Sequence, residues 1–130
     1  MVPVFLSIHH IAVICSDYQK SKEFYVNILK LKIIAEFYRK ERNSWKLDLW
    51  VNDDTQIELF SFPNPPARPS YPEATGLRHL AFAVKSLDEW INHLKNNNIN
   101  VEPPRVDEFT GKRFTFFADP DQLPIELYEL

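Results

Sequence analysis

The chain has 130 residues, 45% of them hydrophobic and 14% aromatic, which is enough for one globular domain with a buried core. Its net charge of -3 at pH 7 provides no basic field for nucleic acid. Cys15 is the only cysteine, so no internal disulfide forms and a reducing cytoplasm is expected. The apolar N-terminal run is too short and too often interrupted to predict a targeting signal or a membrane span.

The first half of the chain predicts one strand, one helix and three further strands. Residues 7–14 form a strand-like run, and Ser16 with Asp17 offers a helix start before the amphipathic stretch 18–29. Three β-rich runs follow, separated by polar turn residues, at 32–39, 45–51 and 55–60. The predicted order is βαβββ.

A connector separates this half from a second one. Residues 62–76 hold five of the ten prolines and one of the two glycines, so they cannot continue a sheet. A strand is then predicted at 77–84, and Ser86 with Glu89 forms a capping box that opens a helix. The last three strands are predicted at 98–106, 112–118 and 124–130. The second half is therefore also βαβββ, and we expect one domain over 1–130, with modules at about 5–61 and about 77–130.

One histidine and one glutamate occupy matching positions in the two halves. Aligning IHHIAV with LRHLAF places His10 on His79, 69 residues later. Aligning QIELF with PIELY places Glu58 on Glu126, 68 residues later. The histidine and glutamate of each half are 48 or 47 residues apart, so only the fold can bring them together.

Strand alternation predicts where these side chains point. In each strand the apolar face should pack on a helix, and the histidine or glutamate lies on the opposite face. His79, for example, shares its side with Ala81 and Ala83. The same alternation turns His9 away from His10, and Arg78 away from His79. His9 is therefore excluded from the predicted site.

Four polar groups that point into a cavity predict a bound cation. An unpaired carboxylate in a dry interior costs several kcal/mol, and a second one adds to the cost. Two neutral imidazoles and two carboxylates form a nitrogen and oxygen site suited to Ni, Zn, Co, Mn or Fe. We therefore expect one divalent metal on His10, Glu58, His79 and Glu126.

Other interpretations exist for each residue taken alone. A histidine in an apolar strand is more often a hydrogen-bonded core residue than a ligand, and a strand glutamate usually faces solvent. The matched pattern in both halves favours the metal site. A protein of this kind could also bind a small molecule without converting it.

The motifs together resemble those of the vicinal oxygen chelate superfamily, and more closely its glyoxalase I (lactoylglutathione lyase) type. The resemblance covers nearly the whole chain and is carried by IHHIAVICSD, KEFYVNIL, QIELF, LRHLAFAV, DPDQ and PIELYE. It implies an α+β fold in which two βαβββ modules form a cupped, open, eight-stranded mixed sheet. It also implies that His10, Glu58, His79 and Glu126 are the metal ligands.

The complete ligand set implies glyoxalase-like chemistry. Relatives that resemble extradiol dioxygenases or fosfomycin-modifying enzymes have no glutamate corresponding to Glu58. The implied reaction isomerises the hemithioacetal of methylglyoxal and glutathione, with a carboxylate moving the proton through a metal-stabilised enediolate. The resemblance assigns the base to Glu126, with Glu58 able to act from the opposite side. The alternatives are a binding protein, and a dioxygenase or other metalloenzyme with a different substrate.

Two departures from the family pattern concern the backbone. The usual Leu-Gly after the first helix is Leu29-Lys30 here, and the usual glycine after DPD is Gln122.

The groups that would bind a substrate carboxylate are less clearly marked. Arg113 and Arg39 are the first candidates, followed by Arg42 and Arg78, although the polar segment around Arg39 is also typical of a solvated turn. The expected partners are a small molecule and, by resemblance, a second copy of the chain, with no nucleic acid and no membrane. A homodimer could complete each site within one chain or across two.

Overall fold

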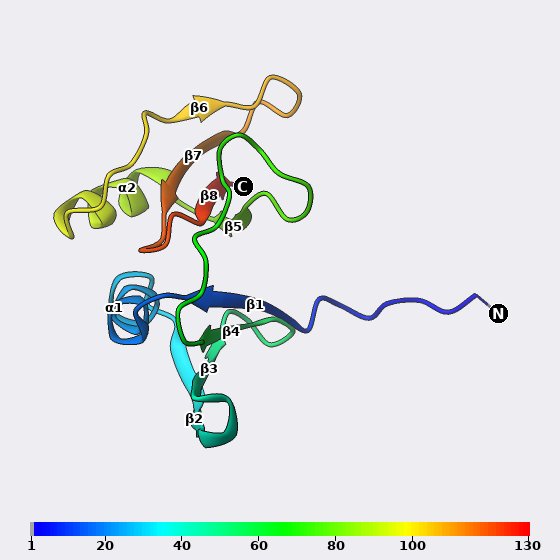
Figure 1. Cartoon of the computed structure of the whole chain (residues 1–130). Coiled ribbons are helices and arrows are strands. Elements are labelled where there is room, and N and C mark those ends of the chain that lie inside the picture. Colours follow the sequence, from blue (N-terminus) through cyan, green and yellow to red (C-terminus); the bar gives the residue numbers. More distant parts are fainter. Residues whose placement is uncertain (1) are drawn as a thin grey trace. The chain divides into compact units, whose positions relative to one another are not determined.

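The computed structural model describes residues 2–130, and Met1, the first residue of the predicted domain, lies outside the described residues (Figure 1). The chain divides into two compact units, residues 2–66 and 67–130, and the division falls within the proline-rich connector. Within residues 2–130 no helix has the length and apolar character needed to cross a membrane.

The first unit contains a four-stranded mixed sheet and one helical segment. Asp17 caps the helix by accepting a hydrogen bond from the Lys20 N–H over 3.2 Å. The sheet order is β1-β4-β3-β2, with β1 parallel to β4 and the other pairs antiparallel. The elements are β1 (His10–Cys15), α1 (Tyr18–Glu23), the π-helical turn η1 (Phe24–Ile28), β2 (Lys32–Arg39), the 3₁₀ turn η2 (Lys40–Arg42), β3 (Ser44–Trp50) and β4 (Gln56–Ser61).

The second unit repeats this arrangement. Its sheet order is β5-β8-β7-β6, and again the first two strands are parallel and the others antiparallel. Ser86 caps the helix as predicted, accepting from the Glu89 N–H over 3.2 Å. The elements are β5 (Leu80–Val84), α2 (Leu87–Asn96), β6 (Arg105–Val106), β7 (Arg113–Ala118) and β8 (Pro124–Glu129). The predicted α+β class and the two βαβββ repeats are therefore confirmed.

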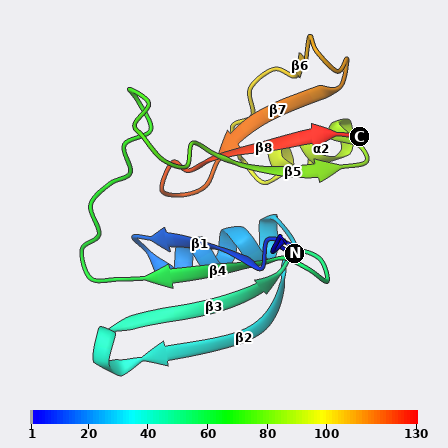
Figure 2. The same cartoon turned by 90° about the vertical axis from the view of Figure 1, so that its right-hand side faces the viewer.

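One helix packs on one face of each sheet, where the core lies (Figure 2). The apolar residues of the IEL strands point to this side: Ile57, Leu59 and Ile125 have no exposed surface, and Leu127 is 2% exposed. Because side chains alternate along a strand, Glu58 and Glu126 are directed to the opposite face of their sheets. The two cores thus fix the orientation of both glutamates.

Three strands are shorter than predicted by two residues or more. The first begins at His10 rather than residue 7, and the predicted strand 77–84 begins at Leu80. In the β5–β8 register His79 would lie opposite Pro124, which has no N–H to extend the ladder. The predicted strand 98–106 is reduced to Arg105–Val106 because it contains two prolines. His10 is therefore the first residue of β1 and His79 lies one residue before β5, so alternation does not restrain the residues that precede them.

Two non-glycine residues adopt left-handed backbone conformations where the family pattern has glycine. Lys30 has φ of 64° and Gln122 has φ of 69°. The turns therefore keep the dihedral angles that glycine would adopt freely, at a cost to the side chains that replace it.

Candidate metal centre

In the first unit, strand pairing brings His10 to Glu58. The Cα of Glu58 is paired with that of Ala12, two residues after His10 on the parallel neighbouring strand. The His10 Nδ1 atom lies 3.4 Å from Glu58 Oε2. Glu58 is buried, whereas the ring of His10 is half-exposed. The small side chain of Ala12 leaves space for this diagonal contact.

The second unit makes the same arrangement with His79 and Glu126. The Cα of Glu126 is paired with that of Ala81, again two residues after the histidine. The His79 Nε2 atom lies 3.0 Å from Glu126 Oε1, and both side chains are largely buried. The His79 ring also makes an edge-to-face contact with Phe116, with 5.0 Å between centroids.

Each pair has the chemistry and spacing of two ligands of one cation. Metal bonds to imidazole nitrogen or carboxylate oxygen are about 2.0–2.2 Å long, so two such ligand atoms lie at most about 4.4 Å apart. The separations of 3.4 Å and 3.0 Å fall inside this limit. The donors therefore fit a divalent metal, considered one pair at a time.

His9 departs from the prediction. Its Nδ1 atom lies 3.0 Å from that of His10, and the ligand atoms of His9, His10 and Glu58 all lie within 4.8 Å of one another. Strand alternation predicted that the His9 side chain points away from His10. Because β1 begins at His10, the backbone at His9 is not held in the pleat of the sheet. The expectation that His9 points away from His10 is wrong.

Lys46 and Asp48 also surround Glu58, and sequence reasoning missed both. Asp48 is the direct cross-strand partner of Glu58 on β3. The Lys46 ammonium lies 2.5 Å from Asp48 Oδ1 and 3.7 Å from Glu58 Oε1. It therefore offsets the repulsion between the two carboxylates. The alternation of polar residues with Leu47 and Leu49 was the available signal, since it places Lys46 and Asp48 on the face of the glutamate.

Arg39 is the last residue of β2. Its Nη2 donates to Ser44 Oγ over 2.9 Å, and its guanidinium lies over the Phe60 ring, 4.9 Å from the centroid. Its Nε is buried and has no hydrogen-bond partner within residues 2–130. Arg42 stacks nearby on Phe62, 5.3 Å from the ring centroid. Within residues 2–130, neither arginine forms a hydrogen bond or an ion pair with His10 or Glu58.

Arg113, the other predicted substrate-binding residue, is engaged elsewhere. Its Nε and Nη2 donate to the two oxygens of Glu129 over 3.2 Å and 3.1 Å, and its Nη1 donates to Asp88 over 3.3 Å. These contacts raise the pKa of the Arg113 guanidinium, and the bond from Arg113 lowers the pKa of Glu129. The residue joins β7 to β8 and to the first turn of α2, and the structure does not bring it to the His79 and Glu126 pair.

Comparison with known proteins places the fold in a family. The family model described as Glyoxalase/Bleomycin resistance protein/Dioxygenase superfamily matches residues 7–127. The crystal structure of a glyoxalase family protein from Enterococcus faecalis superposes with a TM-score of 0.89 at 51% identity, covering 96% of this chain and 98% of that one. The chain therefore belongs to the glyoxalase/bleomycin resistance protein/dioxygenase superfamily, as its motifs indicate.

Two curated relatives differ in what their names state. The uncharacterized protein YwkD of Bacillus subtilis is 63% identical over 123 residues, or 95% of this chain and 96% of that protein. The metallothiol transferase FosB of Staphylococcus saprophyticus is 31% identical over 126 residues, or 94% of this chain and 76% of that protein. Relatives of this chain thus include a protein named as a metallothiol transferase.

Proposed function

We propose that the protein is a metal-dependent lyase of the glyoxalase I type, acting on an oxygen-chelating substrate such as the methylglyoxal–glutathione hemithioacetal. In this proposal His10, Glu58, His79 and Glu126 are the protein ligands of one divalent ion, whether they come from one chain or from two. The observation that carries it is the repetition of one His–Glu contact in both units.

The repeated contact is unusual for purely structural residues. Glu58 and Glu126 point away from the apolar cores of their sheets, and each meets a histidine rather than solvent or an arginine. An imidazole pair with two carboxylates is a suitable donor set for Ni, Zn, Co, Mn or Fe. When bound, such an ion supplies Lewis-acid stabilisation of negative charge on the substrate oxygens.

The proposed role of Glu126 is that of the base. Its carboxylate takes the proton from the hemithioacetal carbon and returns it to the neighbouring carbon, while the hydroxyl proton moves from the oxygen of the first carbon to that of the second, so that an alcohol and a ketone become a thioester and an alcohol. His79 orients Glu126 through the 3.0 Å contact. Glu58 occupies the equivalent position in the first unit and can act from the opposite side of the substrate.

The test is Glu126→Gln in the full chain. The amide keeps an oxygen that can face the cation but cannot accept the proton, so we expect most of the metal to be retained and turnover of the hemithioacetal to fall by about 10²–10⁴-fold. Glu108→Gln, which changes an exposed glutamate, is the matched control. Unchanged turnover in Glu126→Gln would remove the assignment.

A second function is favoured by the FosB relative, which is a metallothiol transferase at 31% identity. In this case the protein would add a thiol to an electrophile, and no carboxylate base at position 58 would be needed. Glu58→Gln separates the two candidates. Loss of hemithioacetal turnover in this variant supports the isomerase, whereas thiol transfer that survives the substitution supports the transferase.

We also propose a homodimer. Several apolar side chains on the strands of the first unit are exposed, and burial against a second copy would remove them from water. They are Ile14, Ile33, Ile34 and Phe37, at 45–54% exposure. Sedimentation at micromolar concentration tests the proposal, and a monomer under these conditions would contradict it.

A further inference from the structure

The second unit contains a pocket of about 540 Å³ next to His79. This volume lies within the range of small-molecule sites. Its wall includes the connector residues Arg68 and Ser70 as well as His79 and Phe116. All the lining residues belong to residues 67–130, so the pocket is a feature of one unit. Arg78, which alternation turned away from His79, lines the same pocket because β5 begins only at Leu80.

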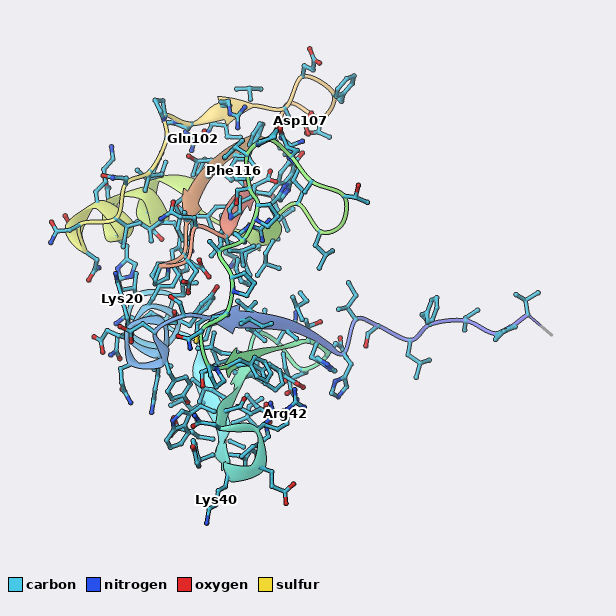
Figure 3. The ribbon with its side chains drawn as sticks, viewed as in Figure 1. Lys20, Lys40, Arg42, Glu102, Asp107 and Phe116 are labelled. Carbon is cyan, nitrogen blue, oxygen red and sulfur yellow. The ribbon has the colours of Figure 1, made fainter. Side chains whose placement is uncertain are left out.

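Two of the three arginines in this pocket are already neutralised. Arg78 Nη2 lies 3.5 Å from Glu73 Oε2, and Arg105 Nη2 lies 2.8 Å from Glu102 Oε1. Glu102 lies on the segment that leads to β6, and its N–H donates to the carbonyl of Phe116 on β7 over 3.1 Å (Figure 3). These ion pairs leave little net charge at this part of the wall.

Arg68 is different because its partners are neutral. Its Nε donates to Ser70 Oγ over 2.7 Å, and its Nη2 donates to the carbonyl oxygen of Arg78 over 3.3 Å. Among residues 2–130 no carboxylate lies within ion-pair distance of Arg68. The pocket therefore carries one uncompensated positive charge, and that charge is fixed at Arg68.

The Arg68 side chain is also held in place before any ligand arrives. The Ser70 hydroxyl that accepts from Arg68 donates in turn to the carbonyl of Gln122 over 3.2 Å. Pro69 restricts the backbone of Arg68 to extended conformations. A guanidinium has five N–H donors, and the bonds to Ser70 and Arg78 use two of them. The Nη donors that remain form a fork suited to the two oxygens of a carboxylate or phosphonate.

We infer that Arg68 is the anion-binding residue of the substrate pocket and that the substrate is a small organic oxyanion. Its carboxylate or phosphonate group binds the Arg68 fork, while its uncharged part lies along Phe116 toward His79. This inference rests on the proposed function for the role of His79, but the binding of an anion at Arg68 does not depend on turnover. Arg68 was not among the arginines that the sequence suggested, because its neighbours in the connector read only as turn residues.

The test measures binding rather than catalysis. Phenylphosphonate and phenylacetate, which share an apolar ring and differ in the oxyanion, are titrated into the full chain by calorimetry, with and without a chelator. For at least one probe we expect Arg68→Gln to raise the Kd about ten- to a hundredfold, the loss expected for a hydrogen bond between charged groups. Lys40→Gln, which removes one positive charge from an exposed turn of the first unit, should alter the Kd less than about twofold.

The two probes also separate the two chemistries. Tighter phosphonate binding identifies a tetrahedral dianion as the substrate group, and tighter carboxylate binding identifies a planar one. Arg68→Lys keeps the charge and loses the fork, so it should fall between the wild type and Arg68→Gln. A shift of the Arg68 Nε–Hε resonance during titration of the wild type gives a readout that needs no variant.

The outcomes distinguish this inference from the proposed function. Equal Kd values for the wild type and Arg68→Gln, or no binding of either probe to the wild type, would overturn the role of Arg68. Metal content is measured in the same samples. If His79→Ala retains all its metal while anion binding still depends on Arg68, the proposed metal function fails and the anion site stands.

Discussion

The Nε2 atom of His79 lies 3.0 Å from Oε1 of Glu126. The strand partner of Glu126 is Ala81, two residues after this histidine. The same offset relates His10 to Glu58 through Ala12 in the first unit. One local rule therefore generates both contacts: a histidine at or one residue before the start of a parallel strand meets a glutamate in the middle of the neighbouring strand. Because the fold is duplicated, the pair of histidine and glutamate donors is duplicated as well.

The metal proposal predicts that each histidine is needed for binding. We expect His10→Ala and His79→Ala each to lower the affinity for a divalent ion by more than about tenfold, because even the outer hydrogen-bond partners of ligands contribute 10–100-fold. The measurement is metal per chain after dialysis against a buffered metal concentration. His93→Ala, which removes a histidine from α2, is the control and should retain its metal. Full occupancy of both ligand variants would contradict the site.

Buried leucine side chains on the strands should contribute to the stability of both units. Leu59→Ala and Leu127→Ala each remove a side chain with 0% or 2% exposure and should lower the free energy of unfolding by about 2–5 kcal/mol. Leu77→Ala removes a side chain that is 83% exposed and should have little effect. Denaturant titration measures all three. A small loss for either core variant would show that its sheet face is not packed as described.

Acid should weaken the contact between Glu129 and its donors. The pKa of Glu129 is held below the usual value of a glutamate, first by the bond from Arg113 and then by the Leu87 N–H at the start of α2. A carboxyl with a lowered pKa stabilises the fold above its unfolded pKa and loses that contribution as the pH falls through its folded pKa.

Glu129→Gln tests this dependence. The variant should be less stable than the wild type near neutral pH, and the difference should shrink as the pH falls below 4.5. Unfolding curves across this range measure it, with Glu108→Gln as a control that should show no such convergence. A difference that is constant with pH would mean that the charge of Glu129 plays no part.

Much of the fold could be predicted from the sequence because each element has a local cause. Alternation in the QIELF and PIELYEL runs, the capping residue Ser86 and the proline-rich connector all act over a few residues. The βαβββ order in both halves follows from them. The ends of the strands could not be predicted in this way, because the length of a ladder depends on whether the neighbouring strand offers a backbone N–H donor. Pro124 offers none.

The same distinction applies to the candidate site. The two His–Glu contacts lie where the duplicated motifs suggested. The sequence analysis misjudged or missed His9, Arg68 and Arg78. These residues lie outside regular strands, so strand alternation does not predict the direction of their side chains. Lys46 was missed because its relevance depends on the β3–β4 register, which the sequence does not specify.

The two left-handed positions predict stabilising substitutions. Lys30 and Gln122 have φ of 64° and 69°, a region that costs most residues about 1–2 kcal/mol but is open to glycine. Part of this gain is offset because glycine loses more backbone entropy on folding. Lys30→Gly and Gln122→Gly should therefore each raise the free energy of unfolding by about 0.5–1 kcal/mol.

Lys95→Gly provides the matched control for Lys30→Gly. Lys95 lies in the last turn of α2, where glycine weakens the helix, so the same change should lower the free energy of unfolding by up to about 1 kcal/mol. Urea denaturation at fixed pH measures both signs in one experiment. If Lys30→Gly lowered the stability as Lys95→Gly does, the Lys30 side chain would contribute more than its backbone conformation costs, and the left-handed turn would not be a source of strain.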